Sequence, residues 1–222
     1  MFTTHLTKLT FSTALVLGSL AFVGGNFSPI SAAQAEKAAQ LAPATNPVVP
    51  VQGLYDALAK IVKSSEGVSQ RKNIVEPAVD NAFNLDEIMH RSIGLHYNNL
   101  NKDERASLLQ AFRNFTVARY VSTFKPGSDT VFTIVPTVKT TQTGQTLVHT
   151  TIGGKADSSN ATSIDYVMKQ TDKGWQITDV LLDGHISQVA AQRSDFKAAF
   201  AQGGAKALTH VLNQKANDFL SE

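Results

Sequence analysis

The stretch WQITDVLLDGHISQVAAQRSDF, residues 175–196, decides the fold of this chain. Its first part, 175–183, is rich in apolar and β-branched residues and is typical of the last strand of a sheet. Asp183-Gly184 is a dipeptide that favours a tight turn. Apolar side chains then recur at helical spacing, which predicts a helix over 186–200. The rest of the chain is expected to pack around this strand–turn–helix corner, which holds the single tryptophan, Trp175.

The predicted strand 175–183 contains a change of phase. Side chains alternate between the two faces of a strand, so Trp175 and Ile177 share one face. Val180 and Leu182 fall on the other face. An inserted residue shifts this alternation by one, so the pattern predicts a bulge or a sharp bend near Thr178-Asp179.

Hydrophobic spacing predicts further helices and strands upstream and downstream of this corner. The strongest helix prediction is 101–124, because Asn101 and Glu104 have the spacing of a capping box. Apolar residues cover well over half of its circumference, so this helix is expected to pack on two sides or to line a cavity. The other predicted helices are 51–64, 69–82, 85–93 and 203–220, and the other predicted strands are 130–138, 145–153 and 162–170.

The order of the elements predicts an α+β fold, in which a helical subdomain packs on a strongly bent four-stranded antiparallel sheet. Strand 130–138 is expected at an edge or a strand end, because Pro136 cannot donate a ladder hydrogen bond. A bent sheet closed by a long apolar helix encloses an apolar pocket, although the same side chains also suit a solid core. The expected wall of the pocket consists of Met89, Phe112, Phe115, Tyr120, Phe124, Phe132, Ile134, Ile164, Tyr166, Met168, Trp175 and Ile177.

The composition excludes several classes of protein. The chain has 222 residues, of which 42% are hydrophobic and 17% charged, which is enough for one domain with a sizeable core. The formal net charge is only +2, and dense basic runs are missing from the sequence, so nucleic acid is not an expected partner. The sequence contains no cysteine, which excludes disulfides and a thiol nucleophile.

The N-terminal segment has the pattern of an export signal. Lys8 precedes the apolar run 15–23, and 31–35 offers the small residues that signal peptidase accepts. We therefore predict a signal peptide over 1–35 that is cleaved before Glu36 and directs the protein to the periplasm. An uncleaved anchor is the alternative. An Ala- and Pro-rich linker is predicted over 36–50 and a single domain over 51–222.

The sequence offers little catalytic chemistry. It contains no Gly-x-Ser-x-Gly elbow, phosphate loop or His-Glu-x-x-His motif, and no pair of histidines has metal-ligand spacing near a carboxylate. Asp179, Asp183 and His185 lie near one another at the turn and are the candidates for acid–base groups. The competing interpretation is structural, because aspartate and glycine suit a turn and Asp183 or Ser187 suits a helix N-cap.

Two ordered sets of residues give the chain a family resemblance over roughly 50–215. The first set is Trp175-Gln176-Ile177-Thr178-Asp179-Val180, Gly184, Ile186-Ser187-Gln188-Val189 and Arg193-Ser194-Asp195-Phe196. The second set is Phe83-Asn84-Leu85-Asp86, Met89, Leu100-Asn101, Glu104-Arg105, Phe112, Phe115 and Tyr120. Together they resemble the periplasmic toluene-tolerance family, whose best-known branch is the Mla-pathway lipid carrier MlaC. The ending QRSDF resembles the hopanoid-biosynthesis-associated branch, HpnM. The sequence departs from the Mla branch at the turn, where Gly184 comes one place early and His185 takes the usual glycine site.

The resemblance implies a cone-shaped sheet of the nuclear-transport-factor type, with acyl chains bound between sheet and helices. It implies a non-enzymatic, monomeric shuttle for phospholipid or a hopanoid-type lipid, needing no cofactor because the lipid is its cargo. The implied partners are an outer-membrane lipoprotein complex and an inner-membrane ABC transporter with its lipid-binding ring protein. The alternative is an enzyme in the same fold that uses Asp179, Asp183 or His185 as an acid–base group.

Overall fold

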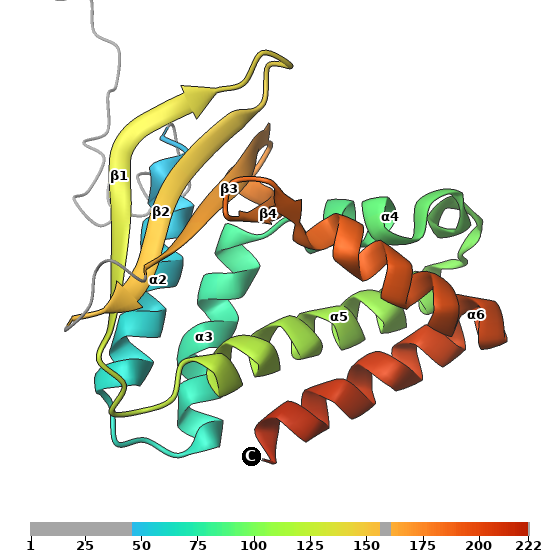
Figure 1. Ribbon diagram of the computed structural model, residues 1–222. Helices are drawn as coiled ribbons and strands as arrows, with labels where there is room; N and C mark the ends of the chain where they lie inside the picture. The colour runs from blue at the N-terminus through green and yellow to red at the C-terminus, as the bar shows by residue number, and fades with distance from the viewer. Residues whose placement is uncertain (1–45, 156–160, 222) are drawn as a thin grey trace, which may run out of the picture. The chain divides into compact units, whose positions relative to one another are not determined.

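The computed structural model describes residues 46–155 and 161–221 (Figure 1). The predicted signal peptide, 1–35, and most of the predicted linker, 36–50, lie outside the described residues. Every helix predicted within the described ranges is present. They are α2 (Val48–Lys63), α3 (Val68–Ala82), α4 (Leu85–Ile93), α5 (Lys102–Thr123) and α6 (Gln188–Leu220). A 3-10 helix that was not predicted, η1 (Gly94–Asn99), follows α4.

Helix α2 begins three residues before the predicted start of the domain, at Val48. Pro50 lies in its first turn. The amide groups of the first turn have no partner within a helix, so a proline there forfeits no hydrogen bond. The last three residues of the predicted linker, 48–50, therefore belong to α2.

The predicted helices 186–200 and 203–220 are joined as α6, with a break between them. Gly203 and Gly204 have non-helical backbone angles, and Gly204 has a φ of 62°, in the region that favours glycine. Beyond the break, the second half of α6 runs back alongside α5 (Figure 1). Phe219 packs against Phe115 with their ring centroids 5.9 Å apart.

The sheet has five antiparallel strands in the order of the chain, not the four that were predicted. They are β1 (Thr130–Thr140), β2 (Thr146–Gly154), β3 (Thr162–Thr171), β4 (Gly174–Leu182) and β5 (Ile186–Ser187). β5 was missed because its residues were assigned to the following helix. Asp183 (φ 51°) and Gly184 (φ 74°) close a tight hairpin, which pairs Ile186 with Leu182 before the helix begins. As predicted for a strand containing Pro136, β1 lies at an edge of the sheet.

The predicted bulge in β4 is confirmed. Val167 pairs with Asp179 and Met168 pairs with Ile177, so Thr178 is the extra residue. The extra residue returns Val180 to the face of Ile177. Val180 pairs with Tyr166, and Leu182 pairs with Ile164, on the face of the sheet that the helices cover. The expectation that Val180 and Leu182 lie on the opposite face is therefore wrong.

Helices cover most of this inner face of the sheet. From α2, Tyr55 packs on Phe132 of β1 and on Tyr166 of β3, at centroid distances of 5.0 and 6.0 Å. The junction between α3 and α4 reaches β4, where the Asn84 amide donates to the Ile177 carbonyl at 2.9 Å. This packing leaves one end of the inner face to α5 and the start of α6.

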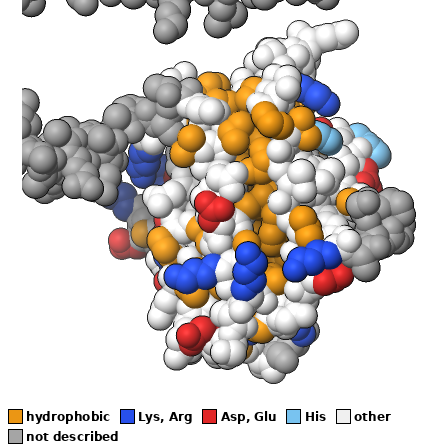
Figure 2. Space-filling model, turned by 90° about the vertical axis from the view of Figure 1, so that its left-hand side faces the viewer, with side chains coloured by type: hydrophobic (Ala, Val, Ile, Leu, Met, Phe, Trp, Pro, Cys, Tyr) orange, Lys and Arg blue, Asp and Glu red, His pale blue; other side chains and the backbone are white. Residues whose placement is uncertain are grey.

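The side of the molecule on which β1 lies is shown in Figure 2. Hydrophobic side chains run down the middle of this face, and Lys and Arg side chains gather in its lower half. Large hydrophobic residues exposed among the described residues are Val49, Leu95, Val131 and Ile186. Within the described ranges, none of the helices combines the length and apolar character needed to cross a membrane.

The capping box at the start of α5 provides a local test of the fold. The Asn101 side chain accepts from the amides of Asp103 and Glu104, and the Glu104 carboxylate accepts from the Asn101 amide. Replacing Asn101 with alanine removes the acceptor and is expected to lower the free energy of unfolding by about 1 kcal/mol. Urea denaturation followed by circular dichroism measures this change. Ser107→Ala, at an exposed position of the same helix, is the control, and equal stabilities of the two variants would contradict the prediction.

Candidate functional site: an apolar cavity beneath α5

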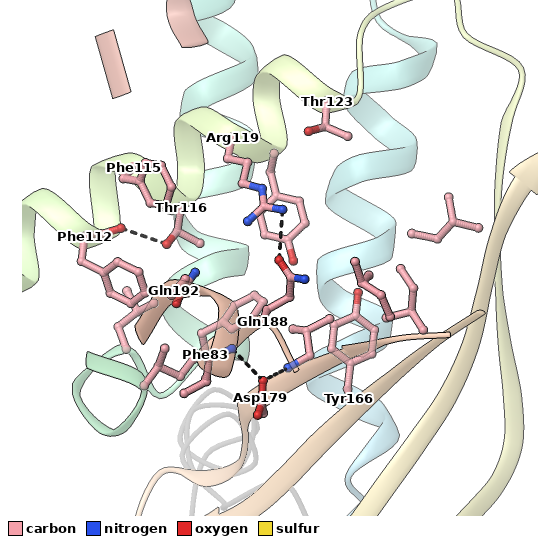
Figure 3. Close-up of a pocket in the computed structure, with 18 of the residues that line it drawn as sticks. Phe83, Phe112, Phe115, Thr116, Arg119, Thr123, Tyr166, Asp179, Gln188 and Gln192 are labelled. Atoms are coloured by element: carbon pink, nitrogen blue, oxygen red, sulfur yellow. Dashed lines mark hydrogen bonds between the residues drawn. The ribbon is translucent and has the colours of Figure 1, made fainter. Parts of the chain in front are cut away.

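A cavity of about 210 Å³ lies between α5, the inner face of the sheet and the first turns of α6 (Figure 3). Most of its wall is apolar, and the polar residues come chiefly from α5 and α6. The apolar lining consists of Phe83, Leu85, Ile88, Phe112, Phe115, Tyr120, Phe124, Ile152, Ile164, Tyr166, Val180, Leu182 and Val189. The polar lining consists of Thr116, Arg119, Thr123, Asp179, Gln188 and Gln192.

Six of the twelve residues predicted for the pocket wall line this cavity. They come from α5 and β3, the two elements whose apolar faces meet across it. These six residues are Phe112, Phe115, Tyr120, Phe124, Ile164 and Tyr166. Whether they contact a lipid stays a prediction.

The other six predicted residues lie elsewhere. Met89 belongs to α4, and the five others belong to parts of the sheet that α2, α3 and α4 cover. Phe132 and Ile134 of β1 pack against the core, with Phe132 between Tyr55 and Phe124. Met89, Met168 and Ile177 are fully or almost fully buried in the core. Trp175 is half-buried and packs against the core near the hairpin between β3 and β4.

Sequence reasoning missed several residues of the cavity that the pattern does contain. Thr116, Arg119 and Thr123 follow Phe112 on one face of α5 at intervals of three and four residues, the spacing of a helix face. Apolar residues alone were counted, so these three were overlooked. Val180 and Leu182 were placed on the wrong face because the bulge was predicted without being applied to the alternation that follows it. The remaining apolar lining residues, Phe83, Leu85, Ile88, Ile152 and Val189, come from elements whose packing no local pattern reveals.

A chain of hydroxyl groups runs behind the apolar wall. Tyr166 donates to the Tyr55 hydroxyl at 3.4 Å, the Tyr55 hydroxyl meets Thr150 Oγ1 at 2.6 Å, and Thr150 donates to the Ile164 carbonyl at 2.9 Å. Burial raises the pKa of the Tyr166 phenol and that of the Tyr120 phenol above their ordinary value of 10.0. Both phenols therefore stay neutral at physiological pH, and this wall of the cavity carries no charge from them.

Asp179 connects the bulge of β4 to the start of α6. Its Oδ1 accepts from the amides of Val180 (2.8 Å) and Val189 (3.1 Å), and its Oδ2 accepts from Ser187 Oγ (2.6 Å). The Arg91 guanidinium lies 3.6 Å from Oδ2. Both oxygens of this buried carboxylate are therefore engaged in holding the corner together.

Asp183 and His185 lie in the exposed turn. The Nδ1 atom of His185 lies 2.7 Å from the Asp183 backbone carbonyl. The Asp179 carboxylate instead accepts from Ser187 and from the Val189 amide of α6, and it pairs with Arg91 of α4. The three candidate acid–base residues thus have separate partners, which favours their structural interpretation. Within 46–155 and 161–221, no group of three or more His, Asp or Glu side chains is arranged to hold a metal ion.

Polar side chains from two helices meet at the rim of the cavity. Arg119 of α5 donates from Nη2 to Gln188 Oε1 of α6 at 3.2 Å, and Figure 3 shows this bond bridging the two helices. Gln192 lies one turn further along α6, on the side of the cavity where Thr116 lies. The Thr116 hydroxyl donates to the Phe112 carbonyl at 2.9 Å. A partly open apolar cavity with a polar, cationic rim suits an amphiphile, whose apolar part fills the cavity while its polar part stays at the rim.

Comparison with known proteins places the chain in a family. A family model described as MlaC protein matches residues 52–214, which is nearly all of the described structure. The chain belongs to the MlaC family. Among solved structures, it is similar to a phospholipid-binding protein from Ralstonia solanacearum, determined in complex with a phospholipid. The TM-score is 0.64 at 14% sequence identity, over 80% of this chain and 99% of the other.

This likeness confirms the α+β architecture of helices on an antiparallel sheet, which this MlaC-family chain shares with its structural neighbour. Membership of the MlaC family confirms the broader of the two resemblances seen in the sequence. No sequence among curated proteins matches the chain.

Proposed function

We propose that this MlaC-family protein binds a membrane lipid in the cavity beneath α5 and carries it through the periplasm. The observation that carries the proposal is an apolar cavity with a polar, cationic rim. Membership of the MlaC family and the structural likeness to a phospholipid-binding protein support it. In this view, the curved sheet acts as one wall of a cone, and the acyl chains enter the cone between β3, β4 and α5.

The size of the cavity limits what it holds in this conformation. Its volume of about 210 Å³ lies below the roughly 300–1,000 Å³ of pockets that enclose drug-sized ligands. A complete two-chain lipid therefore requires the cavity to widen. Each buried CH₂ group contributes about 0.8 kcal/mol to binding. Burial of the acyl chains therefore offsets the free-energy cost of moving α6 away from α5.

We propose phospholipid as the cargo and keep a hopanoid-type lipid, suggested by the QRSDF ending, as the competing cargo. We further propose that the protein works as a monomeric shuttle without a cofactor. It would exchange lipid with an outer-membrane lipoprotein complex and with an inner-membrane ABC transporter and its lipid-binding ring protein. These partners rest on the family resemblance.

The proposal predicts that lipid accompanies the protein during purification. Organic extracts of the purified protein, examined by mass spectrometry, should contain phospholipid at a stoichiometry near one lipid per protein. An extract dominated by a hopanoid-type lipid would favour the competing cargo. Repeatedly empty preparations that also take up no lipid from labelled vesicles would contradict the proposed function.

A further inference from the structure

The rim of the cavity carries a cation without an acidic partner. Within the described ranges, Arg119 forms no ion pair, and its hydrogen bond goes to the neutral amide of Gln188. Other arginines of the same helical layer are paired: Arg113 contacts Asp80 at 2.6 Å, and Arg91 lies 3.6 Å from Asp179. Arg119 is exposed at the rim, so its guanidinium is available to an anion that arrives with the ligand.

The same rim holds a buried amide oxygen without a hydrogen-bond partner. Gln192 Oε1 is shielded from solvent and is one of two such side-chain atoms in the described part of the chain. Buried polar atoms of native proteins are nearly always hydrogen-bonded, because burial without a partner is unfavourable. The Gln192 side chain lines the cavity. Because its Oε1 atom accepts hydrogen bonds, a ligand that satisfies it must carry a donor, such as a hydroxyl of a lipid head group.

These groups face one another across the entrance. Arg119 belongs to α5, whereas Gln188 and Gln192 are four residues apart on one face of α6 (Figure 3). A planar guanidinium binds two oxygens of a phosphate at once, and an amide supplies both a donor and an acceptor. A phosphodiester with a hydroxyl-bearing head group would present acceptor oxygens to the guanidinium and to the amide N–H groups, and a hydroxyl donor to Gln192 Oε1.

We propose that Arg119, Gln188 and Gln192 form a subsite for the phosphodiester and hydroxyl-bearing head group of a phospholipid such as phosphatidylglycerol, an inference that rests on the proposed lipid binding. The phosphate replaces Gln188 as the partner of Arg119. The side-chain N–H groups of Gln188 and Gln192 donate to phosphate oxygens, and Gln192 Oε1 accepts from a hydroxyl of the head group. A lipid without a phosphate offers no partner for the cation, and a bare hydrocarbon leaves Gln192 unpaired.

The competing charge in the cavity is already neutralised. Asp179 is the acid among the lining residues, and its carboxylate accepts from Ser187 and from the amides of Val180 and Val189 and pairs with Arg91. An arriving phosphate therefore meets Arg119 as the unpaired charge of the lining.

The test compares two lipids with identical acyl chains, dioleoylphosphatidylglycerol and dioleoylglycerol, each delivered from micelles of a nonionic detergent that contain no other lipid. Delipidated protein should take up the phosphatidylglycerol in preference. Arg119→Gln should lower the uptake of phosphatidylglycerol about tenfold, the lower end for a charge-assisted hydrogen bond at an exposed site, and leave the uptake of dioleoylglycerol unchanged. Arg119→Lys, which keeps the charge without the planar fork, should retain an intermediate preference.

Arg113→Gln is the matched control, because it removes an arginine from the same helix outside the cavity lining. It should leave both uptakes unchanged. Excess inorganic phosphate alone should not compete, because it lacks the acyl chains that fill the cavity. The opposite result would be displacement of the lipid by inorganic phosphate from the wild-type protein but not from Arg119→Gln. That result would show that the rim binds a free anion, and it would overturn the lipid subsite.

The outcomes separate the two proposals. Uptake of both lipids by the wild-type protein, with no change in preference on Arg119→Gln, would overturn the subsite and leave the lipid carrier intact. Failure of the wild-type protein to take up either lipid would overturn the carrier and the subsite together.

Discussion

Replacing Asp179 with alanine is expected to lower the free energy of unfolding by about 2–4 kcal/mol. The carboxylate is only 4% exposed and accepts hydrogen bonds from Ser187 Oγ and from the Val189 amide at the start of α6. Its loss leaves buried donors unpaired and removes the counter-charge of Arg91. The Arg91 side chain is 39% exposed, so water compensates part of that charge and keeps the estimate below the value for a fully buried pair.

Urea denaturation of the wild type and two further variants gives the matched comparison. Asp179→Asn keeps an acceptor oxygen for the Val189 amide and should cost about half as much. Asp183→Asn, at the exposed turn residue with a φ of 51°, should change stability by less than about 0.5 kcal/mol, because asparagine tolerates this conformation. An Asp179→Ala protein as stable as the Asp183→Asn protein would show that the corner does not depend on this carboxylate.

The contrast between Asp179 and its neighbours shows which features of this corner were accessible from the sequence. The change of phase in residues 175–182 is local, and it predicted the bulge at Thr178. The capping box of Asn101 and Glu104 and the edge position of the strand with Pro136 are equally local, and both were predicted. The role of Asp179 depends on Arg91 and on Val189, which reach it only through the tertiary fold.

The same distinction explains the outcome for the cavity. Residues on α5 and β3 were found because the apolar faces of both elements are visible in their own spacing. Phe132 and Ile134 have the same alternating pattern but lie against Tyr55 and the core, because α2 covers β1. Nothing in the period-two pattern of a strand says which helix covers it. The polar rim was invisible for another reason, since Gln188 and Gln192 join Arg119 only when α6 is placed beside α5.

The second large effect is expected from Val180→Trp, which should remove most of the lipid-binding capacity of the protein. Val180 lines the cavity and is only half-buried, so an indole at this position projects into a volume of about 210 Å³. If the indole excludes about two or three CH₂ groups of an acyl chain, it costs roughly 2 kcal/mol, or about a thirtyfold loss of affinity. Uptake from labelled vesicles and lipid per protein in organic extracts both measure this loss.

The control is Val131→Trp, which places the same side chain at the exposed residue of β1 that is 37% accessible to solvent. It should load lipid like the wild type. Filling an existing cavity creates no large strain, so Val180→Trp should unfold in urea at a midpoint close to that of the wild type. A stable Val180→Trp protein with undiminished loading would place the acyl chains elsewhere. The bulge at Thr178 turns Val180 and Leu182 toward α5, and in that case it would have no role in lipid binding.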